Sequence, residues 1–337
     1  MTIKKVTMKD VAALAGVSKS TVSQYLNHRY EYMGSKTKEK IEQAITALNY
    51  EPNVVARSLK QKRTFTIGVI VSNIMHRYST MVIRAIEDYC HENGYHVVVC
   101  NSDDDLFKEQ TYIHMLIAKQ TDGLIMIPTG ENLELYQDLV DRKIPVVFLD
   151  RKIERVSIPT IVLNNYQGAY KAVAHFANLG HQAIGMITPP LSISTRQERV
   201  YGFQDGLRDF GLSKEPIHLY HVPVTDVKTT LQYVFASEFP PTALLVGNDL
   251  ILMEALSYFK NEGMRLPDDL ALITFDDVSF ADVYEPALTT IAQPGFAMGK
   301  KAAECLISIA TAQGDTCDKD VYFHTELKVR ESCGSQR

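Results

Sequence analysis

Five side chains that can contact DNA gather on one face of a short segment near the N-terminus. The stretch from Lys19 to Leu26 places Val22 and Leu26 at helical spacing on one side. The opposite side carries charged, short or hydrogen-bonding groups, namely Lys19, Ser20, Thr21, Ser23 and Gln24. Side chains of these types can bond to base edges in a major groove. The segment therefore predicts a helix whose outer face suits duplex DNA.

The residues before this segment predict the helix and turn that would position it. Thr7 and Asp10 have the spacing of a capping box, and apolar residues then recur at helical intervals as far as Ala15. Gly16 can adopt the left-handed conformation that ends a helix, and Ser18 is a favourable N-cap for the next one. Two short capped helices joined at a glycine are typical of a helix-turn-helix.

A third helix and the charge of this region strengthen that interpretation. Helical spacing predicts the third helix over about residues 36–48, with four apolar side chains inward: Ile41, Ala44, Ile45 and Leu48. Residues 1–63 contain 12 Lys and Arg against 5 Asp and Glu, whereas the whole chain of 337 residues has a net charge of −5. A basic head on an acidic body indicates that the head alone meets a polyanion. A plain three-helix unit with a solvated lysine-rich surface is the alternative.

The next segment is helical in pattern but marginal in length. Pro52 can begin a helix, and residues 53–59 continue the pattern. Because an isolated helix needs roughly 12 residues, a partner would have to order this one. Residues 60–63 form a basic linker. A simple interdomain tether is the alternative.

Several motifs, in this order along the chain, resemble the signature of the LacI/GalR family of transcriptional repressors. They are Lys9-Asp10-Val11-Ala12, Ala15-Gly16-Val17-Ser18, Ser20-Thr21-Val22-Ser23 and Asn49-Tyr50-x-Pro52-Asn53-x-x-Ala56-Arg57-x-Leu59. The last motif resembles the hinge helix of the family. The resemblance runs through essentially the whole chain.

The resemblance implies a set of DNA-contacting residues. They are Thr7, Ser18, Lys19, Ser20, Thr21, Ser23, Gln24, Asn27, Arg29, Tyr50, Asn53, Ala56 and Leu59. Leu59 from each of two subunits would wedge into the minor groove at the centre of a pseudo-palindromic operator. Many family members carry Arg at the position of Gln24, and Gln favours adenine edges where Arg favours guanine. The loop from Asn27 to Ser35 is unusual, and we expect Arg29, Tyr30 and Tyr32 to supplement the grip on phosphates.

The body of the chain alternates apolar strands with helix-length stretches, which predicts parallel sheets covered by helices on both faces. Nine strands are expected, at Phe65–Val71, Tyr95–Cys100, Gly123–Ile127, Pro145–Leu149, Ile158–Leu163, Ala183–Ile187, Ile217–His221, Thr242–Val246 and Leu270–Phe275. They are too many for one sheet, so two α/β lobes are predicted. By resemblance, this body is like that of periplasmic sugar-binding proteins.

The predicted division is a helix-turn-helix head over residues 1–50, a hinge and linker over 51–63, an effector-binding and dimerisation body over 64–332 and a tail over 333–337. The N-lobe would comprise residues 64–163 and 294–322. The C-lobe would comprise residues 164–293 and 323–332.

Polar residues follow the predicted strands, where the crevice of such a fold binds ligands. The expected effector-binding set, from strand ends and from the family's positions, is Ser72, Asn73, His76, Arg77, Tyr78, Asp150, Arg151, Asn164, Thr195, Arg199, Asn248, Asp276 and Gln293. Carboxylates and guanidinium groups together suit sugar hydroxyls, which both donate and accept. The positive charge of His76, Arg77 and Arg151 predicts an anionic effector, such as a sugar acid or a sugar phosphate. Asp103, Asp104 and Asp105 are interpreted as loop and helix cap rather than as a metal site.

Other classes of function are disfavoured. The chain lacks GxSxG, HExxH, Walker A and GxGxxG motifs, so an enzyme is not expected, nor is a cofactor or metal. A solute-binding protein would have a signal peptide and no basic head. Five cysteines without a CxxC pair indicate reduced thiols, and no apolar stretch approaches a membrane span. The expected location is the cytoplasm, at the nucleoid.

The predicted function is repression of a carbohydrate-utilisation operon by a homodimer, with DNA affinity switched by the effector. Two half-sites require two heads, because the two-fold axis of a dimer matches a palindrome. The apolar segment from Asp249 to Lys260 could supply part of the dimer face, although burial within the lobe explains it equally well. A global catabolite-type regulator that uses a protein corepressor is an alternative, as is a sugar-binding protein without a DNA role.

Overall fold

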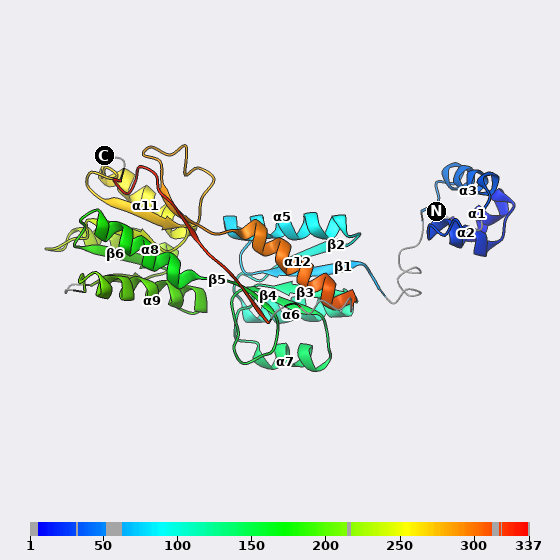
Figure 1. The fold of residues 1–337 in the computed structure, drawn as a ribbon, viewed down its shortest axis with the longest axis horizontal. Helices are drawn as coiled ribbons and strands as arrows, with labels where there is room; N and C mark the ends of the chain where they lie inside the picture. The colour runs from blue at the N-terminus through cyan, green and yellow to red at the C-terminus, as the bar shows by residue number, and fades with distance from the viewer. Residues whose placement is uncertain are drawn as a thin grey trace. The chain divides into compact units, whose positions relative to one another are not determined.

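The computed structural model describes residues 6–31, 33–51, 63–213, 217–311, 317 and 319–335. The chain forms two compact units, divided between Thr64 and Phe65. The first unit is a helical head and the second is an α/β body with two sheets (Figure 1). The predicted fold class is therefore confirmed. The expected hinge helix over residues 53–59 lies outside the described residues, as does Tyr32.

Three helices pack around one small core in the head. They are α1 (Met8–Ala15), α2 (Lys19–Leu26) and α3 (Ser35–Ala47). The buried core consists of Val11, Ala12, Ala15, Val22, Ile41, Ala44 and Tyr50. Ile45 and Leu48, which were expected inward, are partly buried against it. The small residues of α1 allow that helix to contact both α2 and α3.

The first lobe of the body is a parallel sheet in the order β11-β5-β4-β3-β1-β2. Its strands are β1 (Thr66–Val71), β2 (His96–Asn101), β3 (Gly123–Met126), β4 (Val146–Asp150), β5 (Thr160–Leu163) and β11 (Asp320–Phe323). One face is covered by α5 (Arg77–Glu92) and α12 (Gly295–Thr311), and the other by α6 (Leu106–Ala118) and α7 (Leu133–Asp141) (Figure 1). Because both faces are buried, the inner strands are continuous apolar runs.

The second lobe repeats this plan with the strand order β12-β10-β9-β8-β6-β7. Its strands are β6 (Ile184–Thr188), β7 (His218–His221), β8 (Ala243–Val246), β9 (Ala271–Phe275), β10 (Thr289–Ala292) and the antiparallel β12 (Glu326–Lys328). Helices α8 (Asn165–Asn178) and α9 (Ser194–Asp209) cover one face. The 3-10 turn η1 (Val224–Asp226) precedes α10 (Val227–Phe235), which covers the other face with α11 (Asp249–Glu262).

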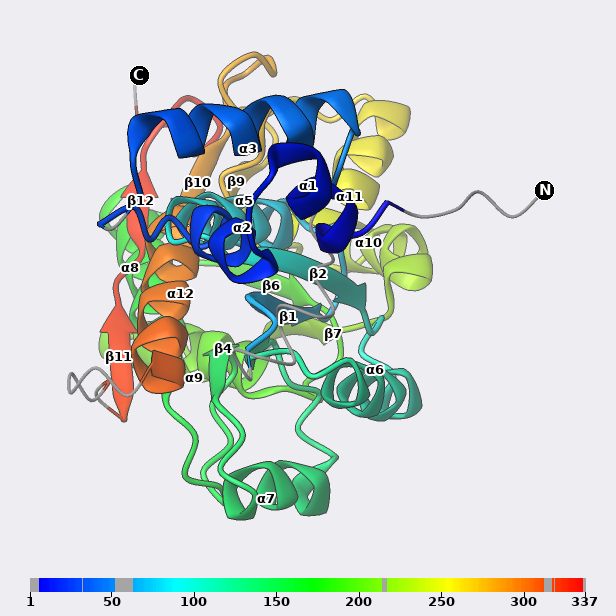
Figure 2. The same cartoon turned by 90° about the vertical axis from the view of Figure 1, so that its right-hand side faces the viewer.

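The chain passes between the two lobes three times. β5 leads into α8, β10 leads into α12, and β11 leads into β12, so each connection joins one sheet to the other (Figure 1). The succession of β11 and β12 is also visible in Figure 2. The nine predicted strands are all present. Three further strands, β10, β11 and β12, were not predicted. Residues 289–292 of β10 pair with β9 and β12, and the chain crosses to the first lobe after this strand.

The prediction of five reduced thiols is wrong for one pair. Cys305 on α12 and Cys317 form a disulfide, with Cα atoms 5.2 Å apart and a sequence separation of 12. Cys90, Cys100 and Cys333 are free and buried. The two bonded residues lack CxxC spacing, and only the fold of α12 and the residues after it brings them together.

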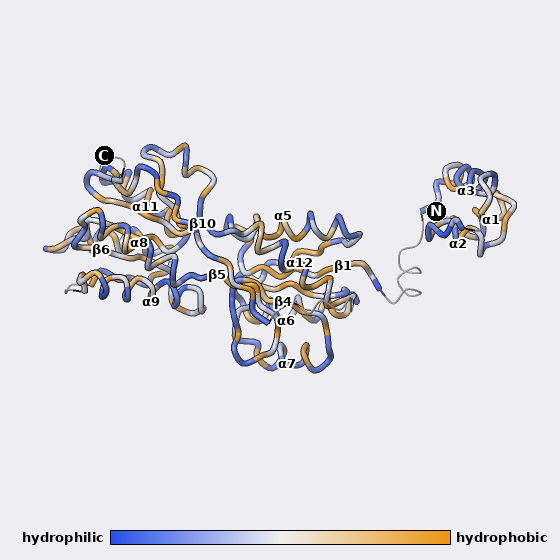
Figure 3. Tube along the Cα trace, in the orientation of Figure 1, coloured by the Kyte–Doolittle hydropathy of each residue, from blue (hydrophilic) through white to orange (hydrophobic). Residues whose placement is uncertain are grey.

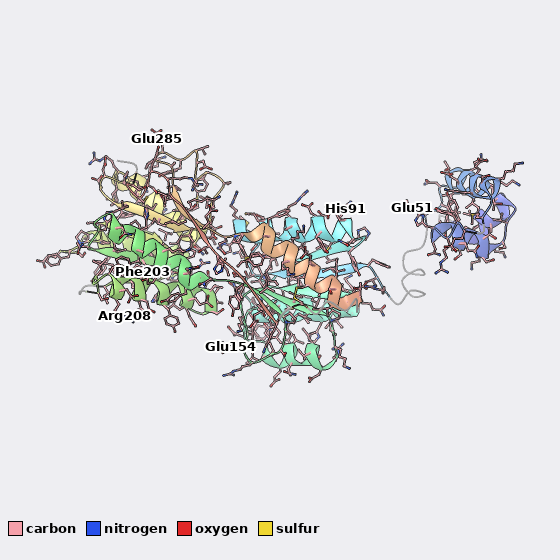
Figure 4. All side chains as sticks on the ribbon, viewed as in Figure 1. Glu51, His91, Glu154, Phe203, Arg208 and Glu285 are labelled. Carbon is pink, nitrogen blue, oxygen red and sulfur yellow. A yellow bond between two sulfur atoms is a disulfide. The ribbon has the colours of Figure 1, made fainter. Side chains whose placement is uncertain are left out.

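Hydropathy follows the layers of the body. The sheets form the apolar interior in Figure 3, and the polar residues lie outward. Figure 4 labels Phe203, which is fully buried in the second lobe, and Arg208 and Glu285, which are exposed. None of the helices described is both long and apolar enough to span a bilayer.

Candidate DNA interface and effector cleft

Local hydrogen bonds fix the start of α1 and its turn into α2. The Asp10 carboxylate accepts from the Thr7 backbone N–H at 2.8 Å and from the Thr7 hydroxyl at 2.7 Å, as the capping-box prediction required. Gly16 ends α1 at φ 65°, in the left-handed conformation. Ser18 caps α2 by accepting from the Thr21 N–H at 3.1 Å. The turn between the two helices is therefore set by the expected residues.

The outer face of α2 is polar and accessible. Lys19, Ser20 and Gln24 are exposed, and Thr21 and Ser23 are half-buried. The Ser18 hydroxyl is also 2.6 Å from the Ser20 hydroxyl and 2.8 Å from that of Thr21. This chain of hydroxyls orients the first turn of the helix while leaving lone pairs for a further partner.

The loop after α2 is ordered by aromatic contacts. Tyr30 hydrogen-bonds to His28 Nδ1 at 2.9 Å, and the Lys38 ammonium lies 4.4 Å from the centre of the Tyr30 ring. Asn27 donates to the Ser23 carbonyl at 2.6 Å, which closes the end of α2. Arg29 is exposed beside these anchored residues. The Tyr30 ring is thus engaged within the head, and Arg29 is the accessible cation of the loop.

The remaining DNA-contact predictions fall in two groups. Tyr50 is 7% exposed and belongs to the core of the head, so it packs against the helices rather than presenting its ring to solvent. Asn53, Ala56 and Leu59 lie outside the described residues. Their minor-groove role stays a prediction.

In the body, a carboxylate of one lobe caps a helix of the other. Asp249, at the start of α11, accepts from His76 Nδ1 at 2.5 Å and from the Arg77 N–H at 3.0 Å. Burial alone would lower the pKa of His76, but the hydrogen bond and the charge of Asp249 raise it. Burial opposes the shift at Asp249 as well, yet the same hydrogen bond keeps the pKa of its carboxyl low. The two charged forms stabilise each other across the lobes.

Arg199 of α9 is held by three groups of the second lobe. Its Nε donates to Asn165 Oδ1 at 2.8 Å and its Nη1 donates to the Gly247 carbonyl at 2.6 Å. The guanidinium group lies 4.0 Å from the centre of the Phe275 ring. Arg199 is 6% exposed. A planar cation held on three sides is well placed to bond a ligand oxygen with its remaining N–H groups.

Carboxylates from both lobes face these cations. Asp150 ends β4, and Asp276 follows β9, where it accepts from the Gln293 amide and from the Asp249 N–H. Burial raises the pKa of Asp150 and of Asp276, and the charge of Arg199 acts against that rise. Both residues have positive φ, 68° for Asp150 and 74° for Asp276, a left-handed conformation that Asp tolerates better than most residues. These turns hold the two carboxylates at the strand ends.

Four buried polar atoms of the predicted cleft residues have no hydrogen-bond partner among the described residues. They are Arg77 Nε, Arg151 Nε, Asp150 Oδ1 and Gln293 Oε1. Two are donors and two are acceptors, and leaving each unpaired costs about 1–3 kcal/mol. A ligand that bonds to these atoms must therefore carry both donors and acceptors.

A pocket opens beside the crossover between the lobes. Its lining comes from the start of α5, from the segments that follow β9 and end β10, and from β12. The lining residues are Arg77, Tyr78, Met81, Asp276, Asp277, Ala292, Gln293 and Lys328. Four predicted residues line this pocket, whereas Asp150, Arg151 and Arg199 lie outside its lining.

Some predicted effector residues already have local partners. Asn164 caps α8 by accepting from the Gln167 N–H, and Asn248 caps α11 by accepting from the Ile251 N–H. Asn73 Oδ1 accepts from the Met75 N–H, and the Ser72 carbonyl accepts from the Asp104 N–H. Thr195 is 3% exposed within α9. A ligand role for these residues requires a further hydrogen bond beyond the local one.

Comparison with known proteins identifies the family. The model of bacterial regulatory proteins of the lacI family matches residues 7–53, and that of the periplasmic binding protein-like domain matches residues 173–333. The probable HTH-type transcriptional regulator EndR of Paenibacillus polymyxa is 48% identical over 304 residues, which cover 89% of each chain. The chain belongs to the LacI family.

Other LacI-family matches extend over nearly the full length. The HTH-type transcriptional repressor PurR of Photobacterium profundum is 36% identical, over 97% of this chain and 98% of the relative. The crystal structure of the lac repressor dimer bound to operator and the anti-inducer ONPF has a TM-score of 0.85 at 27% identity, and the match covers 98% of this chain and 99% of that one. LacI-family proteins are DNA-binding transcription regulators and not enzymes, as was predicted.

Two residues of this LacI-family cleft, Asp104 and Arg196, were missed by the sequence-based set. Asn165 and Asp249 were indicated by their positions at predicted strand ends: Asp249 caps α5 from the other lobe, and Asn165 holds Arg199. Asp104 was interpreted as loop or cap, but it accepts from Arg151 Nη1 at 2.6 Å, and Arg196 Nη2 lies 3.7 Å from its second oxygen. Asp105 is the actual cap of α6. Neither Asp104 nor Arg196 ends a strand, so the pattern of polar residues at strand ends did not indicate them.

Proposed function

We propose that this LacI-family regulator represses a carbohydrate-utilisation operon as a homodimer, and that a small carbohydrate-type effector in the interlobe cleft switches its affinity for DNA. The head would bind half-sites of a pseudo-palindromic operator through α2, with Arg29 adding a phosphate contact. The protein would act in the cytoplasm, at the nucleoid. No cofactor or metal is required for this function.

The presence of both unpaired donors and unpaired acceptors in the cleft supports a carbohydrate-type effector. Each hydroxyl of a sugar can donate to Asp150 Oδ1 or Gln293 Oε1 and accept from Arg77 Nε or Arg151 Nε. A purely apolar ligand would leave all four atoms unpaired, at roughly 1–3 kcal/mol each. A metal ion would be repelled by the arginines, and no metal-binding cluster occurs within the described ranges.

Dimerisation is supported by apolar side chains on the surface of the second lobe. Most apolar residues of α11 are buried in that lobe's own core, but Met253 is 52% exposed. Tyr233 on α10 and Val283 in the loop before β10 are 74% and 82% exposed. A second copy would remove these side chains from water and place two heads on one operator.

Effector binding would act through the geometry of the two lobes. The lobes are joined by three chain crossings and by the Asp249 contact, so a ligand between them changes their relative orientation. A hinge segment that folds only when paired on DNA responds to small changes in spacing between subunits. Release of DNA by the effector is the proposed direction of the switch.

A ligand panel tests the carbohydrate proposal. Thermal unfolding of the full chain would be followed with neutral sugars, sugar acids and sugar phosphates, using the wild type and Arg199→Lys. A ligand at 100 times its dissociation constant stabilises the folded state by about 2.7 kcal/mol. We expect one class of ligand to stabilise the wild type. The same class should stabilise Arg199→Lys far less. Equal stabilisation of both proteins, or no stabilisation by any class, would contradict a carbohydrate effector in this cleft.

A further inference from the structure

Two arginines from different lobes converge on one carboxylate. Arg151 follows β4 in the first lobe, and its Nη1 lies 2.6 Å from Asp104 Oδ1. Arg196 belongs to α9 in the second lobe, and its Nη2 lies 3.7 Å from Asp104 Oδ2. Asp104 itself follows β2 in the first lobe. Each oxygen of one carboxylate therefore faces a guanidinium group of a different lobe.

The three side chains differ in how firmly they are held. The side chain of Arg151 is 5% exposed and that of Arg196 is 18% exposed, whereas that of Asp104 is 37% exposed. Arg151 Nη1 also donates to the Pro128 carbonyl at 3.0 Å. Arg196 Nη1 donates to the Pro190 carbonyl at 2.9 Å and to the hydroxyl of Ser192 at 3.3 Å. Asp104 is thus the most exposed of the three, whereas each guanidinium group is also bonded to a backbone carbonyl.

The surroundings favour a negative charge at this position. Burial, followed by the charge of Arg151, lowers the pKa of Arg196 to about 10, and Asp104 acts against that shift. Arg199 adds to the same positive field. Arg151 Nε is buried without a partner in the described structure. Without an anion, these cations would be partly desolvated and would repel one another.

We propose that Arg151 and Arg196 form a subsite for a carboxylate or phosphate group of the effector, and that the Asp104 carboxylate fills this subsite when the effector is absent. The inference rests on the proposed function, because it takes the cleft as the effector site. It adds the chemical class of the effector, an anionic carbohydrate derivative. It also adds the group that the effector must displace.

When the effector displaces Asp104, its anionic group replaces the Asp104 carboxylate as the bridge between the arginines of the two lobes. An anionic group that enters between the two arginines keeps both cations paired, and Asp104 regains its hydration at the exposed edge of the site. A neutral sugar cannot make this exchange, because it would leave the guanidinium charges without a counter-ion. The competition therefore selects anions over neutral molecules of similar shape.

The test uses inorganic phosphate as the probe and the full-length protein. Thermal unfolding would be followed against phosphate concentration at constant ionic strength, for the wild type, Asp104→Asn and the double variant Asp104→Asn/Arg196→Gln. Asp103→Asn is the matched control, because Asp103 lies in the same loop but pairs with Lys108 at 2.7 Å. Removing the internal competitor should lower the half-saturating phosphate concentration about tenfold in Asp104→Asn. Phosphate bound to the basic head affects all four proteins equally.

We expect Asp103→Asn to have the half-saturating phosphate concentration of the wild type. The double variant should lose the gain in phosphate affinity that Asp104→Asn shows. Identical titrations for Asp104→Asn and Asp103→Asn would overturn the subsite, as would a gain that persists without Arg196. A parallel titration with acetate shows whether carboxylates or phosphates are preferred. If no carbohydrate changes DNA binding while Asp104→Asn still binds phosphate more tightly, the proposed function fails and the anion subsite stands. If a carbohydrate changes DNA binding but Asp104→Asn binds phosphate no more tightly than the wild type, only the subsite is refuted.

Discussion

The hydrogen bond between His76 and Asp249 should control how tightly the two lobes are held together. Asp249 accepts from His76 Nδ1 at 2.5 Å and from the Arg77 N–H at 3.0 Å, at the start of α5. The side chains of His76 and Asp249 are 21% and 10% exposed, so solvent screens their contact only in part. Asp249→Asn removes the negative charge but keeps an oxygen that can accept from Arg77.

The expected magnitude follows from the contact itself. A hydrogen bond between charged groups contributes about 1.5–3 kcal/mol. A loss of about 2 kcal/mol would shift the equilibrium between associated and separated lobes by roughly 30-fold. The same loss should appear in the free energy of unfolding of the body, because separated lobes expose the cleft. Asp88→Asn is the matched control: Asp88 pairs with the 70%-exposed side chain of Arg84 on the surface of α5 and should contribute little.

The pH dependence gives a second readout. The pKa of His76 is raised above its ordinary value of about 6.5, so its contribution is complete below that pH and is lost as pH rises through the folded-state pKa. The pKa of Asp249 is lowered, so its contribution persists above about pH 4 and is lost only in stronger acid. The wild type should therefore lose stability relative to Asp249→Asn as pH rises through the folded-state pKa of His76.

Urea unfolding at several pH values between about 5 and 9 would measure this difference. His76→Gln should remove the same pH-dependent term. If Asp249→Asn and Asp88→Asn lose equal stability, or if the difference in stability between Asp249→Asn and the wild type does not change with pH, the interlobe ion pair does not stabilise the body.

Three further variants test the packing and the two candidate interfaces. Gly202→Ala should destabilise the second lobe by about 3 kcal/mol in urea unfolding, because its Cβ would lie 2.1 Å from the backbone oxygen of Tyr166; a loss under about 1 kcal/mol would show that α8 and α9 can separate. Arg199→Lys should weaken the response of the DNA complex to effector at least about tenfold while leaving effector-free DNA affinity unchanged, because lysine cannot reproduce the planar fork. Gln24→Ala should relax base preference at one position of each half-site, by about 1–3 kcal/mol, with an unchanged salt slope; a changed slope would indicate a phosphate contact instead.

The fold was largely predictable because the buried parallel strands are continuous apolar runs. The strand β10 was not predicted because it begins with Thr289 and Thr290. The hydroxyls of these residues donate to Cys333 and Asp277, which are distant in the sequence. β12 has three residues and carries Glu326 and Lys328 at its ends. Neither segment has an alternation or an apolar run that sequence alone could reveal.

The positions of Asp150 and Asp276 at strand ends could be predicted from the sequence, because each residue follows an apolar run. The contacts that join the lobes could not. His76 and Asp249 are 173 positions apart, and no local pattern marks a carboxylate that caps a helix of another lobe. The disulfide between Cys305 and Cys317 was not predicted for a related reason. The spacing of the two cysteines matches no motif, and their pairing depends on the fold of the chain after α12.

Selection of binding sites from random duplex DNA by the purified full-length protein tests directly whether it is a dimeric, sequence-specific repressor. Enrichment of a pseudo-palindrome with two half-sites is the predicted result, and Gln24→Ala should alter the selected base at one position of each half. Recovery of DNA without sequence preference, with binding that depends only on salt, would contradict a dimeric sequence-specific repressor.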